Sequence, residues 1–379
     1  MDGPRPVKPE EFGELIKLVD RVFQNGDPIM ESAYPAMFSR RNWENLLVIR
    51  QDDRLVSHLG IVFSDAWLHN CRVTTASIGS VCTAPEYERR GLASLLLQAA
   101  FEKCTEQNAQ LVIVSGDRGL YRRSGCFPAG TVTKYEITRD TVDRLEAKGV
   151  ALSPFNRGTA PTMSRLYRLE RACFHRPAYD FRMFVQSGMA MMYKVKTMVV
   201  KKSREPAACL TLALPGDNDL DRAVIVESFG NRESLVQSLP LLFEQYSPPA
   251  IEWAVTGWDG ELANLLGALG LQPKVEPFPG TFRIHNFPGL MERMRPHFSN
   301  VLGKKAADHL AFAEQDGTFI ISLKGGSSVK IDGREKLNKL IFGFPGTSIT
   351  NIIEGDRDII KTLEANLPIP LLWPGLNYV

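Results

Sequence analysis

The sequence predicts a protein of the α+β class, built from two successive segments of one plan and a smaller third segment. Three observations lead to this prediction. Short strand-like runs are interspersed with helices, one order of elements occurs twice, and the last quarter of the chain begins a different order. We therefore expect three domains, at 1–150, 151–284 and 285–379.

The first segment combines antiparallel strands with a strand–helix–strand unit. Its expected elements are a helix at 9–23, strands at 46–50, 55–63 and 73–83, a helix at 91–108 and a strand at 111–114. The last strand reads LVIV and is apolar throughout, which is typical of a strand covered on both faces.

The second segment repeats the outline of the first after a stretch rich in Gly, Pro, Ser and Thr at 149–161, which we expect to be a linker. Its expected elements are a helix at 163–173, strands at 189–201, 207–214 and 223–229, a helix at 232–245 and a strand at 251–255. The repeated order indicates an internal duplication with slight residue identity. The third segment should contain helices at 289–298, 334–342 and 356–367 and a hairpin of strands at 310–314 and 318–323.

Composition excludes several classes of protein. The 379 residues include 45 basic and 43 acidic side chains, so the net charge of +2 does not suggest a protein that coats nucleic acid. The six cysteines form no C-x-x-C pair and the six histidines no H-x-x-x-H, which argues against a disulfide framework or a metal site. The charged, proline-containing start and the absence of an 18-residue apolar run predict a cytoplasmic protein without a signal peptide or a membrane span.

The stretch APEYERRGLAS, at 84–94, has the composition of an anion site between a strand and a helix. Gly91 would let the backbone approach a ligand closely, and Ala93 would leave that approach open. The first N–H groups of the helix, with the positive end of its dipole, form a cradle for an anion. Arg89 and Arg90 add charge suited to phosphate oxygens. Taken alone, the pattern fits a plain strand-to-helix turn with solvated arginines equally well.

The following context supports the anion site. After the strand at 111–114, the stretch GDRGLYRRSGCF places Tyr121 four residues before Gly125. This succession resembles the GNAT (Gcn5-related) N-acetyltransferases, with their R-x-x-G-x-G/A loop, helix, strand and tyrosine segment. The resemblance implies two parallel strands that splay apart around an acetyl thioester, whose carbonyl is polarised by N–H groups of the first strand. The residues that it assigns to acetyl-CoA are Val81, Cys82, Thr83, Arg89, Arg90, Gly91, Leu92, Ala93 and Ser94, with no metal.

Two departures from the motif concern single residues. Glu88 stands where the family has Gln or Arg, and we expect its side chain to point away from the phosphates. Cys126 follows Gly125, so the aromatic position moves by one residue to Phe127.

Two side chains could take part in the chemistry. Tyr121 could protonate the leaving CoA thiolate as a general acid, or it could simply pack beneath the cofactor. Cys82 invites interpretation as a nucleophile. Its apolar neighbours and the lack of a nearby histidine favour a buried, unreactive thiol.

The C-terminal sequence LLWPGLNYV is apolar and stiffened by proline, which predicts a buried tail that carries the carboxylate of Val379 with it. Together with the two motifs above, this ending resembles the enhanced intracellular survival (Eis) family. The resemblance implies a GNAT domain, a second GNAT-like domain without the CoA loop, a sterol-carrier-like domain and a hexameric homo-oligomer. It also implies that the Val379 carboxylate is the base that deprotonates the substrate amine; the alternative is a tail that only fills a groove.

The expected function is transfer of an acetyl group from acetyl-CoA to a primary amine of a small polyamine or aminoglycoside-like substrate. The alternatives are acetylation of lysine in proteins or peptides, and a non-catalytic acyl-CoA-binding or lipid-binding role. Asp27, Ser80 and Tyr378 are expected to contact the substrate, although an acid in place of Tyr378 would hold a polycation better. The second segment reads ESFGNRESLVQSL at the corresponding junction, so we expect one acetyl-CoA per chain. No nucleic-acid or membrane partner is expected.

Overall fold

This computed structural model describes residues 1–24 and 26–379. The contacts between residues divide the chain into two compact units. Unit 1 consists of Met1–Ala129, Pro279–Ile369 and Val379, and unit 2 of Gly130–Phe278 and Pro370–Tyr378. Residues 130–150, which we expected in the first domain, contribute strands to unit 2, and most of the expected third domain clusters with unit 1.

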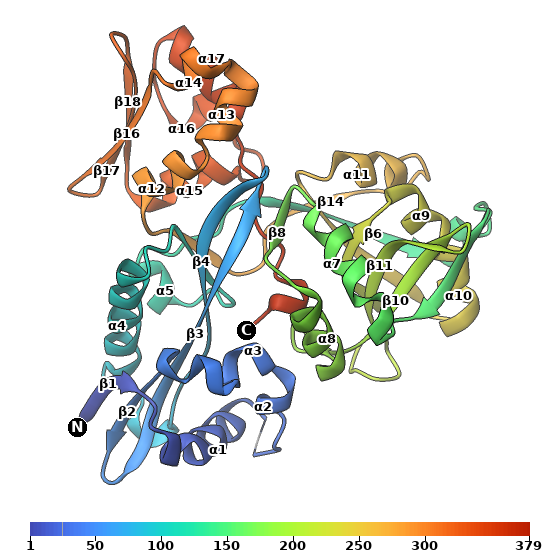
Figure 1. The fold of residues 1–379 in the computed structure, drawn as a ribbon, viewed down its shortest axis with the longest axis horizontal. Helices are drawn as coiled ribbons and strands as arrows, with labels where there is room; N and C mark the ends of the chain where they lie inside the picture. The colour runs from blue at the N-terminus through green and yellow to red at the C-terminus, as the bar shows by residue number, and fades with distance from the viewer. Residues whose placement is uncertain (25) are drawn as a thin grey trace. The chain divides into compact units, whose positions relative to one another are not determined.

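A mixed sheet forms the centre of unit 1 (Figure 1). Its strands, in spatial order, are β1 (Asp2–Pro6), β2 (Leu46–Gln51), β3 (Arg54–Leu68), β4 (Cys71–Thr83), β5 (Leu111–Val114) and β15 (Thr281–Ile284). Neighbours are antiparallel except β4 and β5, which are parallel and joined by helix α4 (Leu92–Glu106). Since α4 packs on β2, β3 and β4, it covers one face of the sheet.

Apart from α4, the helices of the first 129 residues are those at 9–23, where one helix was expected, and several short helices that were not expected. They are η1 (Pro9–Glu11), α1 (Phe12–Phe23), α2 (Met30–Ala33), α3 (Pro35–Phe38), η2 (Arg40–Asn45), η3 (Pro85–Tyr87) and α5 (Gly119–Arg123). In α1 the buried side chains include Leu15, Leu18 and Val19, which share one face of the helix. The buried carboxylate of Asp20 accepts hydrogen bonds from the amides of Ile29 and Met30 and so fixes the start of α2.

Strands β4 and β5 separate toward the end of β4. Their parallel pairing ends at Ile78 and Val114, whereas β4 continues to Thr83. On its other edge β4 contains a β-bulge, because the register with β3 shifts between the pairs Gly60–Gly79 and His58–Cys82. The splayed pair therefore has an irregular strand edge on one side.

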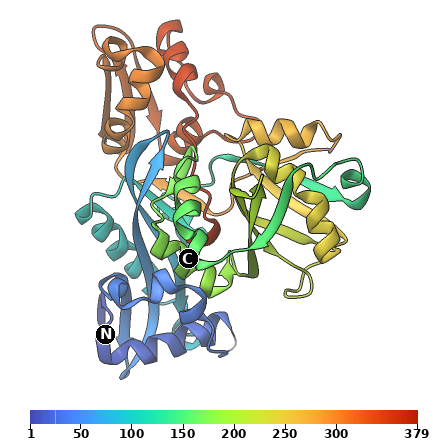
Figure 2. The same cartoon turned by 45° about the vertical axis from the view of Figure 1, so that its right-hand side comes forward.

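The segment at 285–369 adds helices and a small antiparallel sheet to unit 1 (Figure 2). Its elements are α12 (Phe287–Arg293), α13 (Arg295–Leu302), α14 (Lys304–Ala307), β16 (Leu310–Gln315), β17 (Thr318–Leu323), β18 (Ser328–Asp332), α15 (Arg334–Phe342), α16 (Ile349–Ile352) and α17 (Arg357–Asn366). The strands lie in the order β16-β17-β18, and α12 and α15 pack against them. The helix expected at 289–298 is interrupted at Met294, before Pro296 starts a new turn. The likeness to a sterol carrier stays a prediction.

Unit 2 is built around a second mixed sheet. Its strands, in spatial order, are β14 (Lys274–Pro277), β6 (Thr131–Thr138), β13 (Ala250–Thr256), β12 (Ala223–Gly230), β11 (Glu205–Ala213), β10 (Tyr193–Lys202) and β7 (Val150–Pro154), with β9 (Met189–Ala190) paired to β10. Strands β12 and β13 are parallel and are joined by α9 (Arg232–Gln237) and α10 (Leu239–Tyr246). An antiparallel series followed by a parallel strand–helix–strand unit is the plan of unit 1 as well.

The remaining elements of unit 2, together with those above, correct three expectations. They are α6 (Arg139–Val142), η4 (Arg157–Thr159), α7 (Ala160–Arg168), β8 (Ala172–Phe174), α8 (Ala178–Ser187), α11 (Gly260–Gly267) and η5 (Gly375–Asn377). The linker expected at 149–161 is wrong, because β7 and the start of α7 lie within it. The helix expected at 163–173 ends at Arg168, and the helix expected at 232–245 is divided at Ser238, before Pro240.

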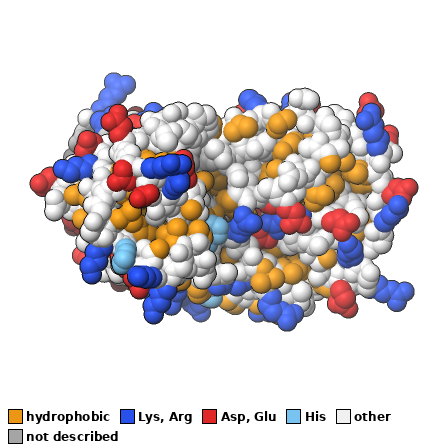
Figure 3. Space-filling view, turned by 90° about the horizontal axis from the view of Figure 1, so that it is seen from above, with side chains coloured by type: hydrophobic (Ala, Val, Ile, Leu, Met, Phe, Trp, Pro, Cys, Tyr) orange, Lys and Arg blue, Asp and Glu red, His pale blue; other side chains and the backbone are white. Residues whose placement is uncertain are grey.

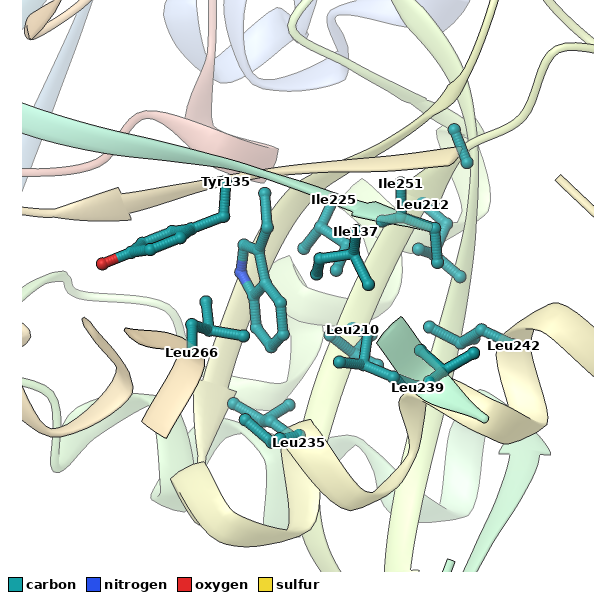
Figure 4. Close-up of a cluster of buried hydrophobic side chains, with 14 of the residues drawn as sticks. Tyr135, Ile137, Leu210, Leu212, Ile225, Leu235, Leu239, Leu242, Ile251 and Leu266 are labelled. Atoms are coloured by element: carbon teal, nitrogen blue, oxygen red, sulfur yellow. The ribbon is translucent and has the colours of Figure 1, made fainter. Parts of the chain in front are cut away.

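The core of unit 2 lies between its sheet and its helices (Figure 4). Trp253 of β13, exposed to only 1%, packs there with leucine and isoleucine side chains from the neighbouring strands and from α9 and α10. On the face drawn in Figure 3, basic and acidic side chains are interspersed and form no continuous basic patch. In the part of the chain that the structure describes, no helix is long and apolar enough to cross a membrane.

Candidate active site

The N-terminus of α4 is open to a ligand. Gly91 is its N-cap residue, with a left-handed φ of 78°, and provides no side chain that could cap the helix. The amides of Ser94 and Leu95 donate to the carbonyl of Gly91 at 3.0 and 3.1 Å. The amides of Leu92 and Ala93 have no hydrogen bond among the described residues, so they and the helix dipole are available to an anion.

A pocket of about 590 Å³ lies beside this helix start, a volume suited to a ligand the size of a cofactor. It is lined by Val22, Phe23, Val81, Cys82, Thr83, Tyr87, Glu88, Arg89, Gly91, Leu92, Ala93, Ser94, Arg118, Leu120 and Arg123. The structure thus brings together eight of the nine residues that the sequence assigned to acetyl-CoA.

The exception is Arg90. Its guanidinium lies 4.7 Å from the centroid of the Tyr87 ring and donates to the carbonyl of Glu86 at 2.9 Å. In this structure the Arg90 side chain is bound to the turn before the loop, and its contact with the cofactor stays a prediction. Glu88, expected to point away, is one of the lining residues, so a carboxylate stands at a largely basic rim.

Sequence reasoning missed two further arginines of the pocket. Arg118 and Arg123 come from the segment after β5, which we had interpreted through Tyr121 alone. The sequence signal for them is an excess of positive charge, because GDRGLYRR contains three arginines and a single carboxylate, Asp117.

The last residue of the chain lies against β4, where this strand has left β5. A Cβ atom at Gly79 would be 2.3 Å from the carboxyl carbon of Val379 and 2.4 Å from its oxygen. Only glycine leaves room for the terminal carboxyl group at this position. Val379 is 8% exposed, and Ser80, the neighbour of Gly79, is buried with a positive φ of 53° at the β-bulge.

The residues before Val379 belong to unit 2 and are held there by hydrogen bonds. The indole of Trp373 donates to the carbonyl of Val226 at 2.7 Å, and Arg176 donates to Oδ1 of Asn377 at 2.6 and 2.9 Å. Arg176 also forms a buried bidentate ion pair with Glu227. The prediction that the tail is buried along a defined path agrees with these contacts.

The other expected site residues have different positions. Tyr121 is buried in α5, 4% exposed, with its ring 3.2 Å from where a Cβ of Gly116 would lie, and it is not one of the lining residues of the pocket. Asp27 is exposed in the turn between α1 and α2, outside the pocket, and Tyr378 is a half-buried residue of unit 2. Their roles in catalysis and substrate binding stay predictions.

Cys82 has a histidine neighbour that the sequence did not reveal. His58 pairs with Cys82 across the β3–β4 ladder, so the expectation of no nearby histidine is wrong. Burial raises the pKa of Cys82 to about 12 and lowers that of His58 to about 4. Both groups are neutral near pH 7, and an unactivated thiol is a poor nucleophile, which agrees with the interpretation of Cys82 as unreactive.

The corresponding junction in unit 2 is built differently. The side chain of Asn231 caps α9 by accepting from the amide of Ser234 at 2.8 Å. Arg232 forms ion pairs with Glu170 and Asp259, so its charge is neutralised. A pocket of about 350 Å³ adjoins these residues, but its helix start is capped and Arg232 is paired, and its second arginine, Arg171, donates to the carbonyl of Trp258 at 3.4 Å. Among the described residues of the whole chain, no group of His, Cys, Asp and Glu side chains is arranged to hold a metal ion.

Comparison with known proteins defines the class of the first part of the chain. Residues 4–129 match the family model of the acetyltransferase (GNAT) domain, which covers the splayed strands, the loop and α4. The chain therefore carries a GNAT acetyltransferase domain and is an acyltransferase; GNAT acetyltransferases use acetyl-CoA as co-substrate. No curated protein matches the sequence.

Solved structures share the fold over nearly the whole chain at low identity. A protein of unknown function from Enterococcus faecalis V583, described as a probable N-acyltransferase, has 15% identity and a TM-score of 0.70, with coverage of 97% of this chain and 98% of that one. A GCN5-related N-acetyltransferase from Anabaena variabilis ATCC 29413 has 16% identity and a TM-score of 0.65, covering 96% of each chain. Eis1 from Mycobacterium abscessus has 13% identity and a TM-score of 0.63, also covering 96% of each.

Proposed function

We propose that this protein transfers the acetyl group of acetyl-CoA directly to a primary amine of a small polyamine or aminoglycoside-like substrate, with the carboxylate of Val379 as the base. The observation that carries the proposal is the contact of this carboxyl group with Gly79, next to the β-bulge of the splayed strand. A buried carboxylate is costly unless it has a partner or a function, and a protonated amine would supply the partner.

The expected binding mode of acetyl-CoA follows from the pocket. The free amides at the start of α4, together with Arg89, suit the diphosphate. Val81, Cys82 and Thr83 line the same pocket, so the pantetheine arm would run along the edge of β4 toward the bulge. An N–H group that the bulge leaves out of the ladder would donate to the thioester oxygen.

In the reaction, the Val379 carboxylate takes a proton from the ammonium form of the substrate, and the neutral amine attacks the thioester carbon. A C–N bond forms, and negative charge on the oxygen of the tetrahedral intermediate is stabilised by the N–H groups of β4. The C–S bond then breaks, and the leaving thiolate takes a proton, for which Tyr121 is the proposed donor. The nitrogen loses its second proton as the amide forms, and this proton restores the phenol of Tyr121. No covalent enzyme intermediate is needed, in agreement with a neutral Cys82.

The second unit would bind no acetyl-CoA, because its helix start is capped by Asn231 and its Arg232 is paired. We propose one acetyl-CoA per chain, a sterol-carrier-like segment at the C-terminal end of unit 1 and a homo-oligomeric assembly, for which a hexamer is expected.

The test is release of free CoA thiol from acetyl-CoA in the presence of polyamines, aminoglycosides and lysine peptides. Turnover with the small amines supports the proposal. Turnover with peptides alone would show that the same reaction acetylates lysine side chains instead. Binding of acetyl-CoA without turnover of any amine would favour the non-catalytic alternative.

A further inference from the structure

Two arginines of the pocket have no role in the reaction described above. Arg118 and Arg123 both line it, and neither forms an ion pair with any residue that the structure describes. Arg122, between them, donates to the carboxylate of Asp117 at 2.6 and 2.7 Å and is not a lining residue. The one carboxylate of this segment is thus used by the arginine outside the pocket.

Gly119 allows the two pocket arginines to gather at one end of α5. A Cβ atom at position 119 would lie 3.0 Å from Nη1 of Arg123, so the Arg123 side chain folds back over the first turn of the helix. There it approaches the chain immediately after Arg118. Two guanidinium groups that line one pocket and have no acidic partner among the described residues favour an anion with two charges.

CoA offers such an anion in addition to its diphosphate. The diphosphate is accounted for by the amides of α4 and by Arg89, whereas the 3′-phosphate of the adenosine is a separate terminal group with two charges. We propose that Arg118 and Arg123 bind the 3′-phosphate of CoA, so that the protein distinguishes acetyl-CoA from acetyl-3′-dephospho-CoA. This inference rests on the proposed binding of acetyl-CoA and adds a phosphate subsite to it.

The experiment compares the Kd of CoA with that of 3′-dephospho-CoA by calorimetry for the full-length wild type and for Arg118→Gln, Arg123→Gln and the control Arg122→Gln. The wild type and the control should bind CoA roughly 10- to 100-fold more tightly than dephospho-CoA, as expected for charge-assisted hydrogen bonds. Arg118→Gln and Arg123→Gln should weaken CoA and leave dephospho-CoA nearly unchanged. Gly119→Ala, which displaces Arg123, should act in the same direction.

Several outcomes overturn the subsite. Equal affinity of the wild type for the two nucleotides does so, and so does an equal loss of both in Arg123→Gln, which would indicate a diphosphate contact. Arg118→Gln and Arg123→Gln could instead change the preference between acetyl-CoA and succinyl-CoA and leave the ratio of the Kd values of CoA and 3′-dephospho-CoA unchanged. That result would assign the arginines to the acyl chain. If neither nucleotide binds, the proposed function itself fails, and this result is distinct from equal binding of both.

Discussion

Substitution of Gly79 by alanine tests the position of the terminal carboxylate at its point of closest contact. The new methyl group would lie 2.3 Å from the carboxyl carbon of Val379, whereas carbon atoms in contact are usually 3.5–4.0 Å apart. The carboxyl group must therefore withdraw by roughly 1.5 Å, since it ends a chain and β4 belongs to a sheet. A shift of about 1 Å in a reacting group can cost about 100-fold in rate, or about 2.7 kcal/mol in activation free energy.

The assay is steady-state release of CoA thiol with the amine identified in the screen, together with calorimetry of CoA binding. We expect kcat to fall about 100-fold and the Kd of CoA to change less than about 3-fold, because the contact lies at the amine side of the thioester. Gly13→Ala is the matched control, since a Cβ at Gly13 meets nothing within 4 Å. In a chain that lacks Val379, Gly79→Ala should cause no further loss, as expected of two changes that act on one group. Wild-type kcat in Gly79→Ala would refute the reasoning.

The remaining predictions concern the acid, the buried histidine and the tail. Tyr121→Phe should lower kcat 10²- to 10⁴-fold with little change in the Kd of CoA if the phenol protonates the thiolate, whereas unchanged kinetics would leave it a packing role. The pKa of His58 is lowered from 6.5 to about 4, so the unfolded chain binds the extra proton first as pH falls. Stability should therefore decrease between pH 6.5 and 4, by up to about 3 kcal/mol, and His58→Gln should show a weaker dependence in urea titrations. Arg176→Met should cost roughly 3–5 kcal/mol of unfolding free energy, because it leaves the carboxylate of Glu227 buried and unpaired; Glu227→Gln in the same background should restore part of it.

Local patterns in the sequence predict many of the helices and strands of this fold, but not β6, β14, β15, β18, α8 or α11. The helix at 91–108 and the hairpin at 310–323 occur as α4 and as β16 with β17, because their composition and their turn residues determine them locally. Strand β1 was not among the expected elements; its two prolines are tolerated because β1 is an edge strand. The helix breaks at 238 and 294 were missed because a proline that starts a new turn does not interrupt the apolar pattern.

Features that depend on distant parts of the chain could not be predicted in the same way. The pairing of His58 with Cys82 depends on strand register, and the return of β15 to β5 joins residues more than 160 positions apart in sequence. At the site, the loop motif predicted the cradle of Gly91 and Leu92, but not the turn of Arg90 onto Tyr87, which is a matter of side-chain packing. Tertiary contacts of this kind leave no periodic signal.

The central claim is that the carboxylate of Val379 is the catalytic base, and one added residue tests it most directly. A chain extended by a single glycine keeps every side chain but replaces the carboxylate at residue 379 by an amide, which cannot accept the amine proton. The account predicts a loss of at least about 100-fold in kcat with an unchanged Kd of CoA, as measured by thiol release and calorimetry. Full turnover by the extended chain would contradict it.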